Sequence, residues 1–128
     1  MKHTTLVLLV CGALAPPRTA VPAPPPAFSG KDLARVAALY ERSRQEGRFR
    51  NEQEERDVNY FMGYVEGAAL ASRKICLPST RGVRDQLGDA TAKYMRQHPR
   101  EWHLPADTLV MKAVQPMFPC SKPSTPKR

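Results

Sequence analysis

The sequence predicts an all-α protein, a small four-helix bundle closed by one disulfide. Apolar residues recur at three- and four-residue steps in four stretches between residues 29 and 117, which is the period of an amphipathic helix. No segment alternates apolar and polar residues with the period of two that a strand requires. With 128 residues, the chain has room for a single folded domain, which we place at residues 28–120.

Residues 1–20 are expected to be a secretory signal peptide. A short basic segment precedes an apolar run from Leu6 to Ala15, which suits a leader but is too short to anchor the chain across a bilayer. Candidate cleavage sites follow Ala15, Ala20 and Ala23. The Pro/Ala-rich spacer at residues 21–27 cannot contribute to a core. We therefore expect export to the periplasm and no stable membrane insertion.

The first two helices are marked by their end signals. The residues from Ser29 to Asp32 have the form of a capping box, and Gly47 is typical of a helix C-terminus. Asn51 then begins a second cap signal. This second helix is expected from Glu52 to Ile75, because Pro78 disfavours helical conformation in front of it.

The second helix is expected to organise the bundle. Phe61 and Val65 belong to its apolar face, which must be buried. Gly63 and Gly67 form a separate row of small residues along which another backbone can come close. Each glycine costs about 1 kcal/mol relative to alanine inside a helix, so we expect packing to offset that cost.

Proline and cap residues define two further helices. Ser79 or Thr80 can cap the third, which ends at His98-Pro99. Pro105 suits the first position of the fourth, and Pro116 ends or kinks it. Their expected inner faces are Val83, Leu87, Ala90, Thr91 and Tyr94, and Leu109, Val110, Ala113, Val114 and Met117.

Cys76 and Cys120 remain as an even pair once the leader is removed. Disulfides persist outside the cytosol, so we expect a bridge between these residues. Two alternatives stay open: a metal site with His98 and His103, or a thiol nucleophile served by one of them. Neither has supporting motif spacing, and we expect no metal ion.

The composition argues against several functional classes. The formal charge is +8, and residues 121–128 form a basic tail that is expected to be disordered. Elsewhere acids are interspersed with the basic residues, and no aromatic-interleaved basic stripe indicates nucleic-acid binding. No catalytic constellation or phosphate-binding glycine loop is evident. We therefore expect neither an enzyme nor a cofactor.

Several short motifs occur together between residues 59 and 120. They are Phe61-Met62-Gly63-Tyr64-Val65-Glu66-Gly67, Ile75-Cys76-Leu77-Pro78, Tyr94, His98-Pro99, His103-Leu104-Pro105-Ala106 and Phe118-Pro119-Cys120. In this combination the chain resembles the Rap/Tai family of immunity proteins, which protect the producing cell against peptidoglycan amidase effectors of type VI secretion. The resemblance implies an all-helical periplasmic protein, commonly a homodimer, that occludes the amidase cleft with a protruding loop.

We expect the partner-binding loop to follow Cys76. Pro78, Ser79, Thr80 and Arg81 are the candidate contacts, with Arg81 as the polar anchor. A second candidate is the turn from Pro99 to His103, which includes Trp102. For these residues we also weigh a structural interpretation, in which Trp102 plugs the end of the core and His103 bonds to backbone.

Two functions of other classes compete with inhibition of an amidase. One is a small periplasmic helical stress chaperone, although the few acids and two mature histidines make no strong acid switch evident. The other is an envelope-associated binding protein whose spacer and basic tail touch the wall or the membrane. The immunity interpretation requires only the helical domain, so truncating both ends would separate these functions.

Overall fold

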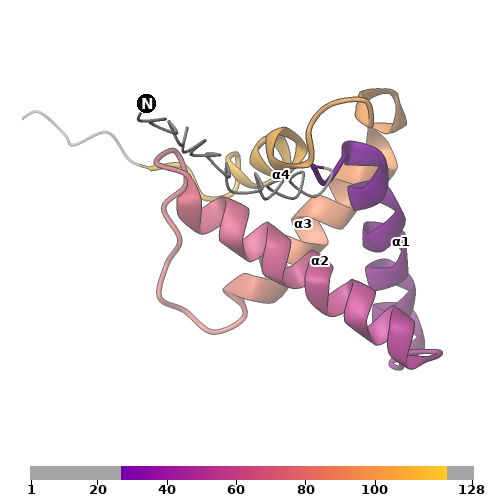
Figure 1. Cartoon of the computed structure of the whole chain (residues 1–128). Helices are drawn as coiled ribbons and strands as arrows, with labels where there is room; N and C mark the ends of the chain where they lie inside the picture. The colour runs from indigo at the N-terminus through magenta and orange to yellow at the C-terminus, as the bar shows by residue number, and fades with distance from the viewer. Residues whose placement is uncertain (1–26, 121–128) are drawn as a thin grey trace, which may run out of the picture.

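The computed structural model describes residues 27–120, which contain four α-helices and one short 3-10 helix (Figure 1). They are α1 (Gly30–Glu46), α2 (Glu52–Ala71), α3 (Val83–Gln97), η1 (Pro99–Glu101) and α4 (Ala106–Val114). The all-α, four-helix prediction is confirmed. The expected signal peptide, most of the spacer and the basic tail lie outside the described residues. Among the described helices, none is long and apolar enough to cross a membrane.

The predicted starts of α1 and α2 are confirmed by their hydrogen bonds. The backbone N–H of Asp32 donates to the Ser29 hydroxyl, and the Asp32 carboxylate accepts from the Ser29 N–H, which completes the capping box. Asn51 accepts from the Glu54 N–H at 2.9 Å. Gly47 ends α1 at φ 66°, a conformation that favours glycine. Local sequence therefore determines both ends of the α1–α2 connection.

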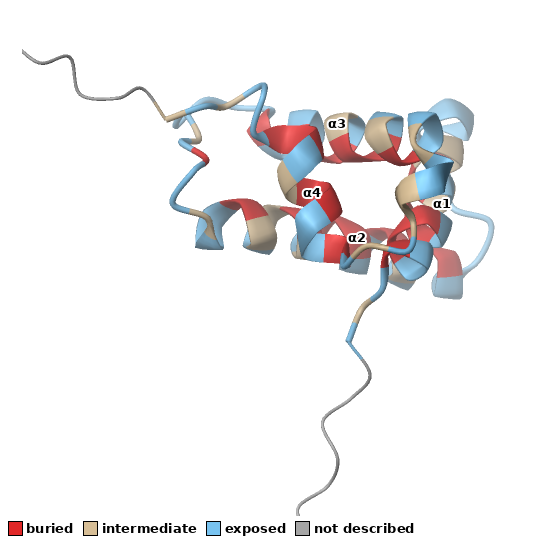
Figure 2. Cartoon of the chain, turned by 90° about the horizontal axis from the view of Figure 1, so that it is seen from above, coloured by how far each residue is buried: buried red, intermediate tan, exposed pale blue. Residues whose placement is uncertain are grey.

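The hydrophobic core lies between the four helices. Figure 2 shows the buried faces of the helices turned toward a common interior. Phe61 and Val65 are 0% and 1% exposed at its centre. The other large side chains that are fully buried there are Leu33, Val36, Leu87, Met95, Leu109, Val110 and Val114. Helix burial thus follows the 3.6-residue pattern of the sequence.

The α1–α2 connection also buries a charged group. Glu54 is 5% exposed and forms an ion pair with Arg42, and it accepts a further hydrogen bond from the Arg50 N–H. The Arg42 guanidinium lowers the pKa of Glu54 below its usual range. Removing one partner of such a pair leaves an uncompensated charge, so the pair favours this one arrangement of the turn.

Gly63 and Gly67 lie on the exposed side of α2. A Cβ atom added at either position would meet no other atom within 4 Å, so no backbone of the described chain approaches this row. The reason is geometric, because a residue two positions from Phe61 or Val65 lies about 200° around the helix from the buried face. The close approaches occur at two glycines that the sequence did not single out. Gly30 lies against the Leu104 carbonyl, and Gly88 against Met62 and Tyr40.

The end of α2 differs from the prediction. The helix stops at Ala71 instead of Ile75, and Ser72 adopts an extended conformation. Ile75 then pairs with Pro119 in an isolated antiparallel bridge and is 7% exposed. The last helical turn that the sequence predicted is therefore replaced by a contact between Ile75 and the segment after α4. This contact is long-range, so the sequence of α2 alone does not specify it.

Two further expectations are wrong. Ser79 and Thr80 do not cap α3, which begins after Gly82 at φ 83° without a side-chain cap. Met117 does not belong to an inner helical face, because α4 ends at Val114 and leaves Met117 51% exposed. Both differences place additional residues on the surface.

Replacing the exposed glycines tests the packing of α2. In the isolated protomer, Gly63→Ala and Gly67→Ala are each expected to raise the free energy of unfolding by about 0.5–1 kcal/mol, because alanine is the better helix former and its Cβ meets open space. Urea unfolding followed by circular dichroism measures the change.

Gly88→Ala is the matched comparison. Its Cβ would lie 2.7 Å from the Met62 sulfur and 3.0 Å from the Tyr40 ring, so this variant is expected to lose stability. Equal effects at all three glycines would contradict this account of which glycines are packed.

Candidate functional site

The disulfide between Cys76 and Cys120 joins the chain after α2 to the chain after α4. The two Cα atoms are 4.8 Å apart, and the Cys76 N–H donates to the Phe118 carbonyl at 3.0 Å. The predicted bridge is confirmed. The alternatives of a cysteine ligand and a thiol nucleophile are wrong, since both sulfurs are bonded to each other.

The bridge anchors a long connection, residues 72–82, which we call the α2–α3 loop. At its first end it is held by the disulfide and by the pairing of Ile75 with Pro119. Leu77 packs against the core, and buried Val83 begins α3 at the other end. The middle of the loop is therefore presented between two fixed points, and Figure 1 shows it bowing away from the helices.

The tip of this loop contains the four predicted contact residues. Pro78, Ser79, Thr80 and Arg81 are all exposed. Because Gly82 occupies the cap position of α3, the hydroxyls of Ser79 and Thr80 are not used in capping. Arg81 has no ion-pair partner among residues 27–120, whereas neighbouring Arg84 pairs with Glu66 at 3.3 Å. The tip thus offers unpaired polar groups in a short segment.

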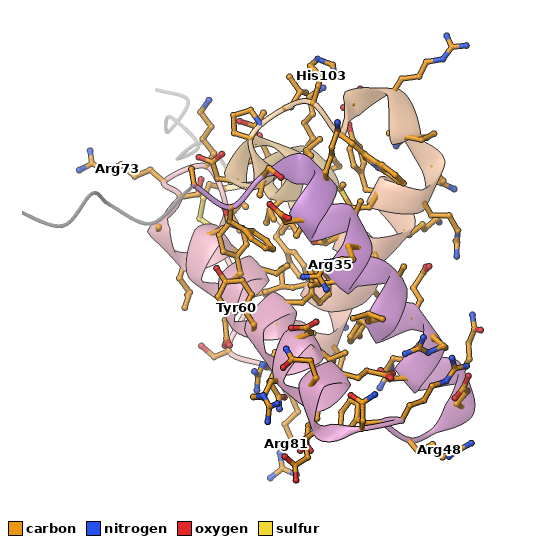
Figure 3. The ribbon with its side chains drawn as sticks, turned by 45° about the vertical axis from the view of Figure 1, so that its right-hand side comes forward. Arg35, Arg48, Tyr60, Arg73, Arg81 and His103 are labelled. Atoms are coloured by element: carbon orange, nitrogen blue, oxygen red, sulfur yellow. A yellow bond between two sulfur atoms is a disulfide. The ribbon has the colours of Figure 1, made fainter. Side chains whose placement is uncertain are left out.

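The second candidate lies elsewhere. Trp102 and His103 follow η1, and Figure 3 shows His103 at the opposite end of the molecule from Arg81. The Trp102 indole donates to the Met95 carbonyl at 2.9 Å and packs against the core. A His103 ring nitrogen lies 2.9 Å from the Arg100 carbonyl. Trp102 therefore covers the core and His103 contacts backbone, as in the structural interpretation. The α2–α3 loop tip and the η1 turn do not form one site.

The turn at η1 is held by a polar cluster that sequence analysis missed. The Tyr94 hydroxyl donates to Glu101 at 2.7 Å, and the Lys112 ammonium donates to the same carboxylate at 2.9 Å. Lys112 and Tyr94 together lower the pKa of Glu101, while burial and Glu101 raise the pKa of Tyr94. The His98 ring stacks on Tyr94 at 4.0 Å between centroids. These contacts use the polar groups internally and stabilise the turn.

A shallow groove lies beside the start of α3 and was also not predicted. It has a volume of about 400 Å³, and Phe49 and Met62 line it together with Arg48 and Arg84. Phe49 is 41% exposed, and Gly47, two residues before it, adopts the αL conformation that ends α1. In the sequence, this surface could have been predicted from Phe49, an apolar residue between Arg48 and Arg50.

The described residues contain no group of three or more His, Cys, Asp or Glu side chains that could hold a metal ion. Two surface features are suited to binding another macromolecule. They are the α2–α3 loop, which is exposed at its tip and held at both ends, and the groove lined by Phe49 and Met62.

Residues 29–120 match the family model of Rap1a immunity proteins. The chain belongs to the Rap1a immunity protein family. Searches of the curated proteins and of the solved structures gave no match. The predicted resemblance to the Rap/Tai family is confirmed, and the match begins at the Ser29 cap, so it also includes α1, which the motif-based resemblance did not cover.

Membership of the Rap1a family identifies the chain as an immunity protein directed at a secreted effector. The matched segment contains all four helices, the α2–α3 loop and both bridged cysteines. The Rap1a domain therefore coincides with the folded domain, and its binding surface is to be sought on that domain.

Breaking the disulfide is expected to destabilise the Rap1a domain strongly. The bridged residues are separated by 44 positions, and on the chain-entropy model a loop of that size contributes about 4 kcal/mol. The double variant Cys76→Ser/Cys120→Ser should lose that amount in urea unfolding. Reduced wild-type protein is the control and should behave like the double variant. An unchanged unfolding midpoint would contradict a structural role for the bridge.

Proposed function

We propose that this Rap1a protein is a periplasmic immunity protein that binds a peptidoglycan amidase effector of type VI secretion and blocks its cleft with the α2–α3 loop. The observation that carries the proposal is an exposed loop tip, held at both ends, in a chain of an immunity family. The inhibition is steric: the bound loop keeps peptidoglycan out of the amidase cleft.

Anchoring of the loop supports this mechanism. Immobilising a flexible side chain at an interface costs about 0.5–1.5 kcal/mol, so a loop that is already restrained binds more tightly. The disulfide and the Cys76–Phe118 hydrogen bond restrain one end, and the α3 start restrains the other. Pro78 has a fixed φ angle and further limits the conformations of the tip.

The side chains of the tip suit a polar cleft. The Arg81 guanidinium carries five N–H donors and is not used inside the described part of the chain. It can bind carbonyl or carboxylate groups at the cleft of the amidase. Ser79 and Thr80 add hydroxyls that donate and accept, while Pro78 supplies an apolar contact.

The periplasm is the compartment in which this inhibition would protect the cell. The pattern of residues 1–20 supports export, and the Cys76–Cys120 disulfide is of a kind that persists outside the cytosol. A peptidoglycan amidase reaches its substrate in the same compartment. The inhibitor and its target would therefore meet there.

The outer face of α2 is our proposed homodimer contact. Tyr60 is 53% exposed there, and the open row at Gly63 and Gly67 allows a second backbone to approach. Gly63→Arg is expected to convert a dimer to a monomer in sedimentation velocity, because its side chain would fill that space. The matched control is Gln53→Arg, on the first turns of α2. A wild-type protein that sediments as a monomer at all concentrations would contradict the dimer.

Charge reversal at the loop tip tests the inhibitory mechanism. Thr80→Glu/Arg81→Glu removes two donors and places carboxylates in the cleft, so we expect the dissociation constant for the amidase to rise about 30-fold or more. Calorimetric titration against the amidase encoded nearest to this protein, together with a muropeptide cleavage assay, measures the loss.

Two comparison variants make the result specific. Lys93→Glu, on the exposed side of α3, is expected to inhibit like the wild type. Arg100→Glu/His103→Glu tests the second candidate turn and is also expected to retain inhibition. Inhibition that survives the Thr80 and Arg81 changes but is lost with Arg100 and His103 would place the contact at the η1 turn.

A further inference from the structure

The groove beside the start of α3 lies at the same end of the molecule as the tip of the α2–α3 loop. Arg84 and Asp85, on the first turn of α3, line the groove and follow Arg81 closely in the sequence. Figure 3 shows Arg81 and Arg48 at the lower end of the molecule, with His103 at the other end. A protein that contacts the loop tip is therefore positioned to contact the groove as well.

The floor of the groove is apolar. Tyr40 from α1 and Val58 and Met62 from α2 line it and are buried. Phe49, from the α1–α2 connection, also lines the groove but is exposed. With a volume of about 400 Å³, the groove falls within the size range of clefts that bind ligands. An apolar side chain of a partner would cover Phe49 there and remove apolar surface from water.

The groove is also positively charged. Three arginines and one acid line it, namely Arg44, Arg48, Arg84 and Asp85. Within the described part of the chain, Arg48 has no ion-pair partner. The contact of Arg44 with Asp89 is long, at 3.9 Å. Arg84 pairs with Glu66 at 3.3 Å, but more than half of the Arg84 side chain stays exposed. Such surface pairs are weak, so these guanidiniums remain available to a partner.

We propose that the groove binds an acidic segment of the effector, in which carboxylates flank an apolar side chain, and so selects the effector that the loop tip blocks. This inference rests on the proposed function, because it assigns a second contact to the same complex. The apolar side chain would pack against Phe49 and Met62. The carboxylates would pair with the arginines, whose planar guanidiniums bind carboxylates through two parallel hydrogen bonds.

The shape and composition of the groove favour a protein segment over other anionic partners. A flat lipid surface cannot follow a concave groove, and a sugar or phosphate polymer has no apolar side chain for Phe49 and Met62. Aromatic residues and arginines are also the residue types that dominate contacts between proteins. The proposed homodimer face at Gly63 lies on another side of α2, because residues 62 and 63 are about 100° apart around the helix.

Titration of the amidase encoded nearest to this protein tests the groove in residues 21–128, which contain every described helix and the disulfide. Arg48→Glu and Phe49→Ser should each raise the dissociation constant about tenfold or more, because one removes the charge and the other the apolar contact. Arg48→Lys keeps the charge and should weaken binding less than Arg48→Glu.

Matched controls carry the same changes outside the groove. Arg73 is exposed, has no ion-pair partner among residues 27–120, and lies far from Arg48 (Figure 3). Met117 is an exposed apolar residue that does not line the groove. Arg73→Glu and Met117→Ser should each change the dissociation constant by less than about threefold. Circular dichroism and urea unfolding verify that all variants are folded.

A muropeptide cleavage assay separates the groove from the loop tip. At saturating concentrations, Arg48→Glu and Phe49→Ser should still inhibit the amidase completely, because the tip occupies the cleft once the complex has formed. The groove variants should therefore change the concentration needed for inhibition and leave its extent unchanged.

Three outcomes would overturn the inference. Unchanged dissociation constants for both groove variants, in a protein whose wild type binds the amidase, would do so and leave the proposed function intact. Equal losses from Arg48→Glu and Arg73→Glu would show attraction by net charge alone. Competition by heparin that is lost with Arg48→Glu but kept with Phe49→Ser would assign the groove to polyanions. A wild-type protein that does not bind the amidase would instead contradict the proposed function, and this inference with it.

Discussion

The Cys76–Cys120 connection is the constraint on which the rest of this structure depends. The covalent bond, the Cys76–Phe118 hydrogen bond and the pairing of Ile75 with Pro119 all join the same two segments. Together they end α2 early, bury Ile75 and fix the start of the α2–α3 loop. They also bring the chain after α4 beside Arg73. These three long-range interactions therefore position the proposed inhibitory loop.

The proposed inhibitory loop depends on this anchor. The loop tip gains a restrained conformation from it, which reduces the entropy lost when a partner binds.

The opposite end of the domain has mainly structural interactions. Tyr94, Glu101 and Lys112 satisfy each other, and Trp102 covers the core while donating to Met95. At the α1–α2 turn, Glu54 is buried with Arg42. Charged and aromatic residues that suggest a binding site in a sequence thus serve here to hold turns.

Much of the fold was predictable because it depends on local interactions. The capping box at Ser29, the cap at Asn51 and the αL glycine at Gly47 are determined by residues within one helical turn. The buried positions of Phe61 and Val65 follow from helical spacing. Even the exposure of Gly63 could have been derived, since its angle from that face is a property of the helix alone.

The sequence by itself determined the four amphipathic helices, most of their caps, the pairing of the two cysteines and the family, because these depend on short-range spacing and residue type. Only the tertiary structure decided that α2 ends at Ala71, that Gly88 is the packed glycine of α3, and that Arg81 and His103 lie apart. These features arise where distant segments meet, and the energy of such contacts is not contained in either segment alone.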